Sequence, residues 1–498
     1  MNEKAGIKAF IESLQIEVQN NPKLSAVYDS CKMALVDLQG PLRVAITGVI
    51  KTGKSTLLNA FLGRYIVPTA VEVMTYNVNW FHHVKHSDDG KEKIVVRMLD
   101  GVKSEYSIEK LSEFVGYSST HKELLDSVHW VDVYLNHPLL EVFDLIDTPG
   151  LDSLMGTDSQ HTRDLLTKEE NRPDAIIYLV YPEFKSKDIT AVADFHESTG
   201  LISGLNSIAA LTRADMMVQK FEEAEEKIRS NKERYADIRY YFLNIYPIAA
   251  LPAQASFMLN DYDIELLREL PKINNIATFT ADYNTFVDKF DWQTKEIRSH
   301  LCTLLSIDGV RLSIEYFEQN PIATAEAYKS YLYDFSRVEL LKSIVIDHFG
   351  GRADFHKCNR VLSRLRKVCA RTIQQKEIGH DVRIVIQGIT QRINQLDFEL
   401  HQHYAEYYIL NDYYNGEDYF TEDEWEEVKC VLGEYGSEDF ERLNVSKDTT
   451  KTEIQSAYDS LCKTWQKRAV KFGFIGNTRA NEVSLQIARI IQSYSNNL

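Results

Sequence analysis

Apolar residues recur at helical spacing through the first 38 residues of the chain. Ile7, Leu14 and Val18 share one face, and the pattern restarts after Pro22. An amphipathic arm of this kind needs a partner for its apolar stripe. We expect it either to pack against the adjoining domain or to form a bundle with helices from the far end of the chain.

Strand-like and helical stretches alternate between about residue 39 and residue 250. Short apolar runs predict strands at 42–48, 131–136, 141–147, 175–181 and 206–211. The second and third of these runs are expected to be neighbouring strands, and residues 55–63 have a helical pattern. Such alternation predicts an α/β domain with a mixed, mostly parallel sheet and helices on both faces.

Beyond about residue 260 the pattern is almost entirely helical. The pair Gly350–Gly351 is typical of a hinge or a helix end, and we use it as a domain boundary. The chain therefore divides into an N-terminal helical segment (1–38), an α/β domain (39–350) and an all-α helical stalk (351–498). The N-terminal segment is expected to join the stalk.

Charge and cysteine content restrict the class of protein. The 498 residues carry a net charge of −17, which argues against general nucleic-acid binding because a phosphate backbone rewards clustered Lys and Arg. None of the six cysteines forms a CxxC pair, so we expect reduced thiols in a cytoplasmic protein. No run approaches the roughly 20 apolar residues that cross a bilayer, and the N-terminus lacks a signal-peptide core. A membrane contact would therefore be peripheral, at the inner face.

The strongest chemical signal is the loop Gly48-Val-Ile-Lys-Thr-Gly53-Lys54-Ser55, between a predicted strand and a predicted helix. It fits the GxxxxGKS pattern of phosphate-binding loops, whose glycines let backbone N–H groups point at a phosphate. The following helix N-terminus adds a favourable dipole. Lys54 would reach the β- and γ-phosphates, and Ser55 would bind Mg²⁺. Nucleotide contacts are predicted for Gly48, Lys51, Thr52, Gly53, Lys54, Ser55 and Thr56.

A second motif, Asp147-Thr-Pro-Gly150, follows the apolar strand EVFDLI. A carboxylate at such a strand end can hold Mg²⁺ through its hydration shell. The Gly150 N–H can touch a γ-phosphate and respond to its loss. The remaining metal ligand is assigned to Thr75, with Thr69 as the competing choice. The predicted metal ligands are thus Ser55, Thr75 and Asp147.

The base-reading motif is Thr212-Arg213-Ala-Asp215, after the NSIAAL strand. Asp215 would accept hydrogen bonds from the guanine ring N–H and its exocyclic amine, and ATP would leave such a buried carboxylate unpaired. Arg213 stands where lysine is usual, and its flat guanidinium can stack on the base. The alternative is that Thr212 or Asp215 merely caps a helix. A final guanine loop, with weaker support, would use the backbone of Ala249 and Ala250.

With these motifs in place, the chain resembles the dynamin superfamily of large GTPases, and most closely its bacterial dynamin-like proteins. The phrase GKSTLLNAFLGRYIVPT, the spacing to Thr75 and the LTRAD motif carry the resemblance. It implies a GTPase head that dimerises with itself or with a paired dynamin-like subunit, joined to a helical stalk that includes the N-terminal helix. Family members commonly remodel membranes. The resemblance is specific in the first 220 residues and is one of architecture beyond them.

Two departures from the family pattern concern the catalytic water. Ile50 stands where eukaryotic dynamins carry a glutamine, and Leu151 stands where Ras-like proteins do. Neither apolar side chain can orient water. Lys51 occupies the place of the internal arginine finger of guanylate-binding proteins and atlastins, so it is a hypothetical cation for charge between the β- and γ-phosphates. Catalysis is assigned to Lys51, Lys54, Ser55 and Thr75, and the water-positioning group is not identified.

Aromatic residues are dense between 403 and 420, before Trp425. They could form a stalk tip that touches lipid, but the neighbouring acidic residues favour helix packing or a protein interface.

These motifs lead to one reaction and two downstream functions. The reaction is hydrolysis of GTP to GDP and phosphate with Mg²⁺. The downstream function is either reshaping of a membrane or a GTP-controlled switch that acts on a protein partner. An ATP-driven enzyme is disfavoured by Asp215.

Overall fold

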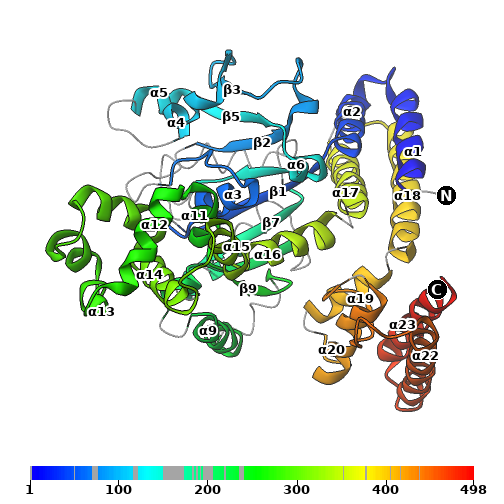
Figure 1. Ribbon diagram of the computed structural model, residues 1–498. Coiled ribbons are helices and arrows are strands. Elements are labelled where there is room, and N and C mark those ends of the chain that lie inside the picture. Colours follow the sequence, from blue (N-terminus) through cyan, green and yellow to red (C-terminus); the bar gives the residue numbers. More distant parts are fainter. Residues whose placement is uncertain are drawn as a thin grey trace.

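The structure is a computed structural model, and it describes most of the 498 residues. The described residues are 3–49, 51–69, 77–115, 122–149, 173–181, 184–186, 189–190, 192–193, 206–217, 220–234, 241–350, 353–375, 378–403, 405–414, 417–436 and 438–497. They form a nine-stranded sheet in the order β4-β3-β5-β2-β6-β1-β7-β8-β9, surrounded by helices (Figure 1).

Five parallel strands make the half of the sheet that ends at the predicted nucleotide motifs. They are β6 (Phe143–Asp147), β1 (Leu42–Gly48), β7 (Ala175–Val180), β8 (Ser207–Leu211) and β9 (Ile245–Pro247). Their residues are almost all buried, as expected for strands covered on both faces. The expected α/β fold with a mixed, mostly parallel sheet is confirmed.

The other half of the sheet reverses direction at β2 (Asn79–His83), which is antiparallel to β6 and parallel to β5 (Val128–Leu135). Antiparallel β3 (Lys93–Met98) and β4 (Lys103–Tyr106) complete the edge. The prediction that 131–136 and 141–147 are neighbours was wrong, because β2 lies between β5 and β6. The short α6 (Pro138–Val142) packs on β2 and connects β5 to β6 in the chain.

Helices cover both faces of the sheet. On one face α3 (Lys54–Leu62), α11 (Ala250–Met258) and α16 (Val338–Val345) share a core with the inward side chains of β1 and β6. On the other face α9 (Phe221–Arg234) packs against β7 and β8. The short helices α4 (Leu111–Val115) and α5 (Lys122–Ser127) lie near the β3–β5 edge.

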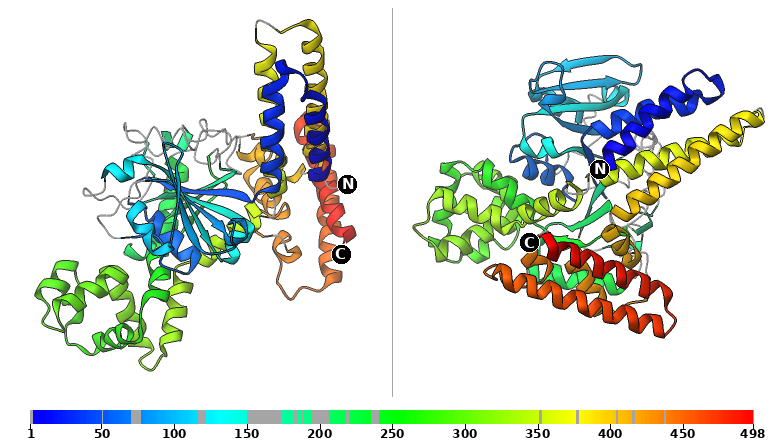
Figure 2. Two further views of the ribbon diagram at one scale, coloured as in Figure 1. Left: turned by 90° about the horizontal axis from the view of Figure 1, so that it is seen from above. Right: turned by 90° about the vertical axis from the view of Figure 1, so that its right-hand side faces the viewer.

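The N-terminal arm forms a bundle with helices that follow the α/β domain in sequence. Helices α1 (Glu3–Val18) and α2 (Ser25–Gln39) pack on α17 (Ala353–Ile373), and α1 also contacts α18 (His380–His403). The bundle extends to one side of the sheet (Figure 2). The sequence left open whether the arm packs against the adjoining domain or forms a bundle with later helices, and the structure has the bundle. Helix α17 of this bundle also contacts β1 of the sheet.

A helical unit with its own core lies on the opposite side of the sheet (Figures 1 and 2). It contains α12 (Asp261–Glu269), α13 (Ile276–Phe279), α14 (Lys295–Gln319) and α15 (Ala325–Phe335). The division at residues 39–350 includes this unit in the α/β domain and stays a prediction.

The C-terminal helices are α19 (Ala405–Tyr414), α20 (Glu422–Val431), α21 (Asp439–Arg442), α22 (Lys451–Phe474) and α23 (Thr478–Asn497). Phe420 and Trp425 are buried, and Phe420 packs against Trp465 of α22. These aromatic residues therefore serve helix packing rather than forming an exposed tip. None of the helices in the described part of the chain is long and apolar enough to cross a membrane.

Candidate functional site

The predicted phosphate loop connects the end of β1 to the start of α3. Gly48 has a φ of 146°, and a Cβ there would collide with the carbonyl oxygen of Leu179 on the adjacent strand. Gly53 also has a positive φ and caps α3. Both backbone conformations favour glycine. The two glycines of the motif are therefore required by the path of the loop itself.

Side chains inside the loop hold its shape. The buried Lys54 directs its Nζ at the carbonyl oxygens of Gly48 and Val49, at 3.4 and 3.2 Å. Thr52 Oγ1 donates to the Val49 carbonyl at 2.9 Å. Ser55 and Thr56 are half-buried in the first turn of α3. The lysine ammonium is thus held within the curve of the loop, at the N-terminus of a helix.

The predicted base-reading loop is hydrogen-bonded to the phosphate loop. Thr212 Oγ1 donates to the Thr52 carbonyl at 2.8 Å, and Arg213 Nη2 donates to the Lys51 carbonyl at 2.5 Å. The Arg213 guanidinium lies over the ring of Tyr181, with Cζ 5.0 Å from its centroid. Because these contacts engage the guanidinium, the arrangement favours a role for Arg213 in joining the two loops over stacking on a base.

Asp215 lies buried in the 3₁₀ turn Ala214–Met216. Burial, together with the nearby carboxylate of Asp308 on α14, raises the pKa of Asp215 to about 7. Asp308 is itself half-buried and forms an ion pair with Arg311 at 2.9 Å. Helix α14 packs against the turn. A member of the separate helical unit therefore contributes to the electrostatics of the predicted guanine site.

The predicted final guanine loop is tied to its surroundings through the backbone. The Ala214 N–H donates to the Ile248 carbonyl at 3.1 Å, which joins this loop to the base-reading turn. The Ala249 N–H donates to the Ser336 carbonyl at 2.9 Å, and Ala250 begins α11. Contacts of Ala249 and Ala250 with a base stay predictions.

The predicted metal side lies at the same edge of the sheet. Asp147 is fully buried at the end of β6, which runs parallel to β1, so the two strand ends meet there. Asn79 Nδ2 approaches Asp147 Oδ2 at 3.5 Å. The Ser55 hydroxyl and the Asp147 carboxylate are oxygen donors, the type that Mg²⁺ prefers. Thr75 and Gly150 lie outside the described residues.

The competing threonine, Thr69, is held by a polar cluster that sequence reasoning missed. Gln254 of α11 donates to Thr69 Oγ1 at 3.3 Å and accepts from Asn59 Nδ2 at 3.0 Å. Asn59 also binds the backbone of Ile66 and Val67. The available signal was a lone amide in the apolar helix STLLNAFL. The cluster ties the end of α3 to α11.

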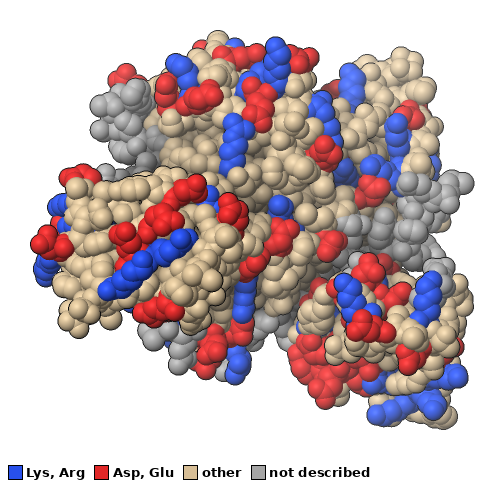
Figure 3. All heavy atoms as spheres, in the orientation of Figure 1, with Lys and Arg blue, Asp and Glu red and all other residues tan. Residues whose placement is uncertain are grey.

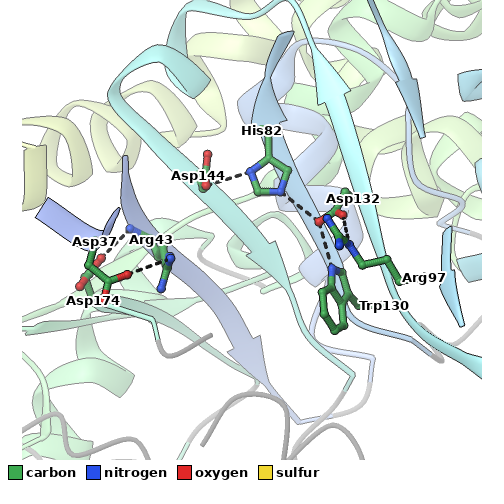
Figure 4. A network of polar contacts seen from close by, with 8 residues as sticks. All are labelled: Asp37, Arg43, His82, Arg97, Trp130, Asp132, Asp144 and Asp174. Atoms are coloured by element: carbon green, nitrogen blue, oxygen red, sulfur yellow. Dashed lines mark hydrogen bonds and ion pairs between the residues drawn. The ribbon is translucent and has the colours of Figure 1, made fainter. Parts of the chain in front are cut away.

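Two polar networks lie on the sheet away from the nucleotide motifs (Figure 4). In the first, His82 bridges Asp144 and Asp132 at 2.9 and 3.2 Å, and Arg97 contacts Asp132. The pKa of His82 is raised to about 9, because the pull of the two carboxylates outweighs the opposing effect of burial. This histidine is therefore a charged structural link at neutral pH.

The second network joins the start of the sheet to the helical bundle. Asp37 of α2 pairs with Arg364 of α17 at 2.6 Å and with Arg43 of β1 at 3.3 Å. Asp174, just before β7, pairs with Arg360 of α17 at 2.7 Å. These side chains are mostly buried. The strands β1 and β7 thus begin at the bundle, and β1 ends at the phosphate loop.

Comparisons with known proteins agree with the motifs. Residues 44–195 match the model of the dynamin family. Isoniazid-induced protein IniC of Mycobacterium tuberculosis is 24% identical over 345 residues, which cover 66% of this chain and 67% of the relative. Dynamin-like protein 2 of Campylobacter jejuni is 27% identical over 301 residues, which cover 56% of this chain and 46% of that protein.

Solved structures give weaker matches. A chain of an oligomerised bacterial dynamin pair aligns with a TM-score of 0.34 and 15% identity, and the alignment covers 94% of this chain and 86% of that one. Aquifex aeolicus Era bound to GDP·AlF4⁻ aligns with a TM-score of 0.24 and 16% identity over 42% of this chain and 50% of that one.

Proposed function

Because this chain belongs to the dynamin family of GTPases, we propose that its head hydrolyses GTP to GDP and phosphate at the loop between β1 and α3. The observation that carries the proposal is the pair of hydrogen bonds from Thr212 and Arg213 to the backbone of Thr52 and Lys51. They hold a base-reading loop against a phosphate loop, as one bound nucleotide requires.

The phosphate end of the substrate would contact the loop backbone and Lys54. The loop N–H groups and the N-terminus of α3 favour a phosphate electrostatically. The Lys54 ammonium donates to two loop carbonyls in this structure, and it would donate to the β- and γ-phosphate oxygens when the nucleotide is bound. Ser55, Asp147 and Thr75 would hold Mg²⁺, which neutralises phosphate charge when it is bound.

The guanine end would contact the Asp215 carboxylate, which accepts from the ring N–H and the exocyclic amine. Adenine offers no hydrogen-bond donors in these positions, so bound ATP would leave the buried Asp215 carboxylate without hydrogen bonds. Arg213 would act indirectly, because its hydrogen bond to the Lys51 carbonyl links the two loops. Selectivity for GTP over ATP is thus assigned to one side chain.

Lys51 is the proposed cation for charge that develops between the β- and γ-phosphates. Its φ of 65° is unusual for a residue with a side chain, and Arg213 holds its carbonyl. The side chain itself is exposed. The Lys51→Ala variant should slow single-turnover hydrolysis by at least about tenfold while retaining GTP affinity. An unchanged chemical step with weaker binding would remove this role.

The binding proposal is tested with purified full-length chain, Mg²⁺ and fluorescent guanine nucleotides. Wild type should bind GTP and GDP, prefer them over ATP, and turn GTP over to phosphate. Asp215→Ala should lose guanine selectivity, and Lys54→Ala should lose triphosphate affinity. At pH 8, where Asp215 is mostly ionised, Asp308→Asn on α14 is the matched control that should retain both. If wild type has no measurable affinity for guanine nucleotides, the proposal fails.

We extend the proposal to coupling between the head and the helical bundle. Strand β1 carries Gly48 at one end and Arg43 at the other, where Arg43 meets Asp37 of α2. A shift of the phosphate loop would therefore act on the bundle through one strand. The coupled output would be nucleotide-dependent dimerisation together with membrane binding or remodelling, and the alternative is a switch that acts on a protein partner. Flotation with vesicles, with and without a GTP analogue, separates the two.

A further inference from the structure

Asp147 lies in surroundings that differ from those of most carboxylates. Asp and Glu side chains are spread over the face of the molecule drawn in Figure 3, where water solvates them. Asp147, at the end of β6, is fully buried instead. A buried carboxylate is costly unless polar groups surround it, so the side chains beside Asp147 affect what it can bind. One of these side chains is Asn79 of β2.

The register of the sheet places Asn79 beside Asp147. Strands β2 and β6 are antiparallel, and Asn79 is the direct partner of Asp147. Partner residues on neighbouring strands point to the same face of a sheet, and that face alternates along each strand. The next pair on this face, Phe81 with Leu145, lies in the core that α3 covers. The Asn79–Asp147 pair therefore lies on the α3 face, at the edge where the metal ligands are proposed.

The amide nitrogen of Asn79 joins Asp147 to the backbone. Asn79 Nδ2 lies 3.5 Å from Asp147 Oδ2 and 3.3 Å from the carbonyl oxygen of Asn77. An amide nitrogen carries two N–H groups, so these two acceptors engage both of them. The donor side of Asn79 is therefore fully used, and it helps to fix the orientation of the Asp147 carboxylate.

The amide oxygen of Asn79 is the unusual end of this side chain. Asn79 is fully buried, and its Oδ1 accepts no hydrogen bond from the residues that the structure describes. Buried polar groups are normally paired with protein or with ordered water, because an unpaired one is costly. This acceptor lies beside Asp147 on the face that α3 covers, so a hydrogen-bond donor that arrives with the substrate and its metal ion would satisfy it.

From this arrangement we infer that Asn79 is a positioning residue of the proposed magnesium site. Mg²⁺ at nucleotide sites keeps several of its water molecules, and the groups that bind these waters orient the site. Asn79 Oδ1 would accept a hydrogen bond from a water of this hydration shell. Its Nδ2 would at the same time hold the Asp147 carboxylate in the orientation that faces the metal. Asn79 would thus act through water and Asp147, and would touch neither Mg²⁺ nor GTP.

The competing role is purely structural, in which Asn79 only joins β2 to β6. It fits less well, since a structural amide is expected to find an acceptor and a donor within the protein, and Oδ1 has no donor among the described residues. The inference rests on the proposed function, because it requires GTP and Mg²⁺ to bind between β1 and α3. Nucleotide binding by wild type tests that function, and the Mg²⁺ requirement of Asn79 variants tests the inference.

The test is a Mg²⁺ titration of the full-length chain with a fluorescent, non-hydrolysable GTP analogue. Asn79→Leu keeps the approximate size of the side chain and removes both donor and acceptor. It should need about tenfold more Mg²⁺ than wild type for half-maximal binding, which is the usual scale for a group that orients metal ligands. Saturating Mg²⁺ should restore binding. Asn79→Asp keeps an acceptor oxygen at this position, so its Mg²⁺ requirement should be lower than that of Asn79→Leu.

Phe81→Leu is the matched control, because Phe81 lies on the same strand and face but packs in the apolar core. It should lower the thermal unfolding midpoint and leave the Mg²⁺ requirement unchanged.

The inference is overturned if Asn79→Leu titrates like wild type, or if saturating Mg²⁺ does not restore its binding. It is also overturned if Phe81→Leu raises the Mg²⁺ requirement equally, or if Asn79→Asp needs as much Mg²⁺ as Asn79→Leu. A wild type that binds no guanine nucleotide at any Mg²⁺ concentration would instead refute the proposed function, and the inference with it.

Discussion

The charge state of Asp215 makes the proposed guanine site dependent on pH. An ordinary aspartate is ionised throughout the neutral range, but burial and Asp308 raise the pKa of Asp215 to about 7. Guanine needs the carboxylate, because both of the hydrogen bonds that it offers there come from donors. Protonation therefore opposes binding, and affinity should fall as pH drops through 7.

The size of the effect follows from this pKa. The ionised fraction of Asp215 in the free protein is about 90% at pH 8, about half at pH 7 and about 10% at pH 6. GDP should thus bind roughly tenfold more weakly at pH 6 than at pH 8 from this group alone. At pH 7, binding should release about half a proton per site.

Two variants on α14 should move this profile in opposite directions. Asp308→Asn removes the repulsion on Asp215, so the pKa should fall and GDP should bind more tightly at pH 6.5. Arg311→Gln removes the partner that offsets the Asp308 charge at 2.9 Å, so the midpoint should move to higher pH. The double variant should return towards the Asp308→Asn profile, because the repulsive charge is then absent.

The assay is titration with fluorescent GDP at pH 6 to 8 and constant ionic strength, supported by calorimetry in buffers with different ionisation enthalpies. The terminal phosphate of GDP also titrates near pH 6, so Asp215→Asn, which keeps that contribution and loses the carboxylate, sets the baseline. If wild type and Asp215→Asn show parallel profiles, or if Asp308→Asn leaves the wild-type midpoint in place, the reasoning is refuted.

Three further substitutions test the packing around the site. Arg364→Met should lower the free energy of unfolding by about 1.5–3 kcal/mol in urea, because the buried Asp37 loses its closest charged hydrogen-bond partner and keeps only the longer pairs with Arg43 and Arg360. Gln254→Ala should cost about 1–3 kcal/mol in the same measurement, since it removes one of the two acceptors of the buried Asn59 amide and leaves one N–H without a hydrogen bond. Gly48→Ala should abolish nucleotide binding at unchanged expression, because a Cβ would displace the loop.

Two controls separate these effects from general damage to the helices. Arg366→Met removes a more exposed ion pair on the same α17 and should cost no more than about 1 kcal/mol. Gly63→Ala has open space around its Cβ and adds only left-handed backbone strain at the end of α3, so nucleotide binding should persist. Equal losses in a variant and its control would contradict the stated cause.

Local patterns determined much of the head. The run 42–48 and the glycines of the loop that follows predict β1 and the start of α3, because a buried strand and a tight phosphate loop are both encoded in consecutive residues. The family resemblance was confirmed by the match over residues 44–195. The side chains placed around nucleotide and metal stay predictions. The order of the strands could not be predicted from local sequence patterns, because the position of β2 between β5 and β6 depends on pairing between segments that are distant in the chain.

Only the tertiary structure decided which polar groups share a buried site. Arg213 could be matched to a motif by position, but its contact with the Lys51 carbonyl depends on two loops 162 residues apart. Likewise, Asp37 meets Arg364 because α2 and α17 pack together. The physical reason is that backbone preference arises among neighbours in the chain, whereas the energy of a buried charge depends on partners that folding brings from elsewhere.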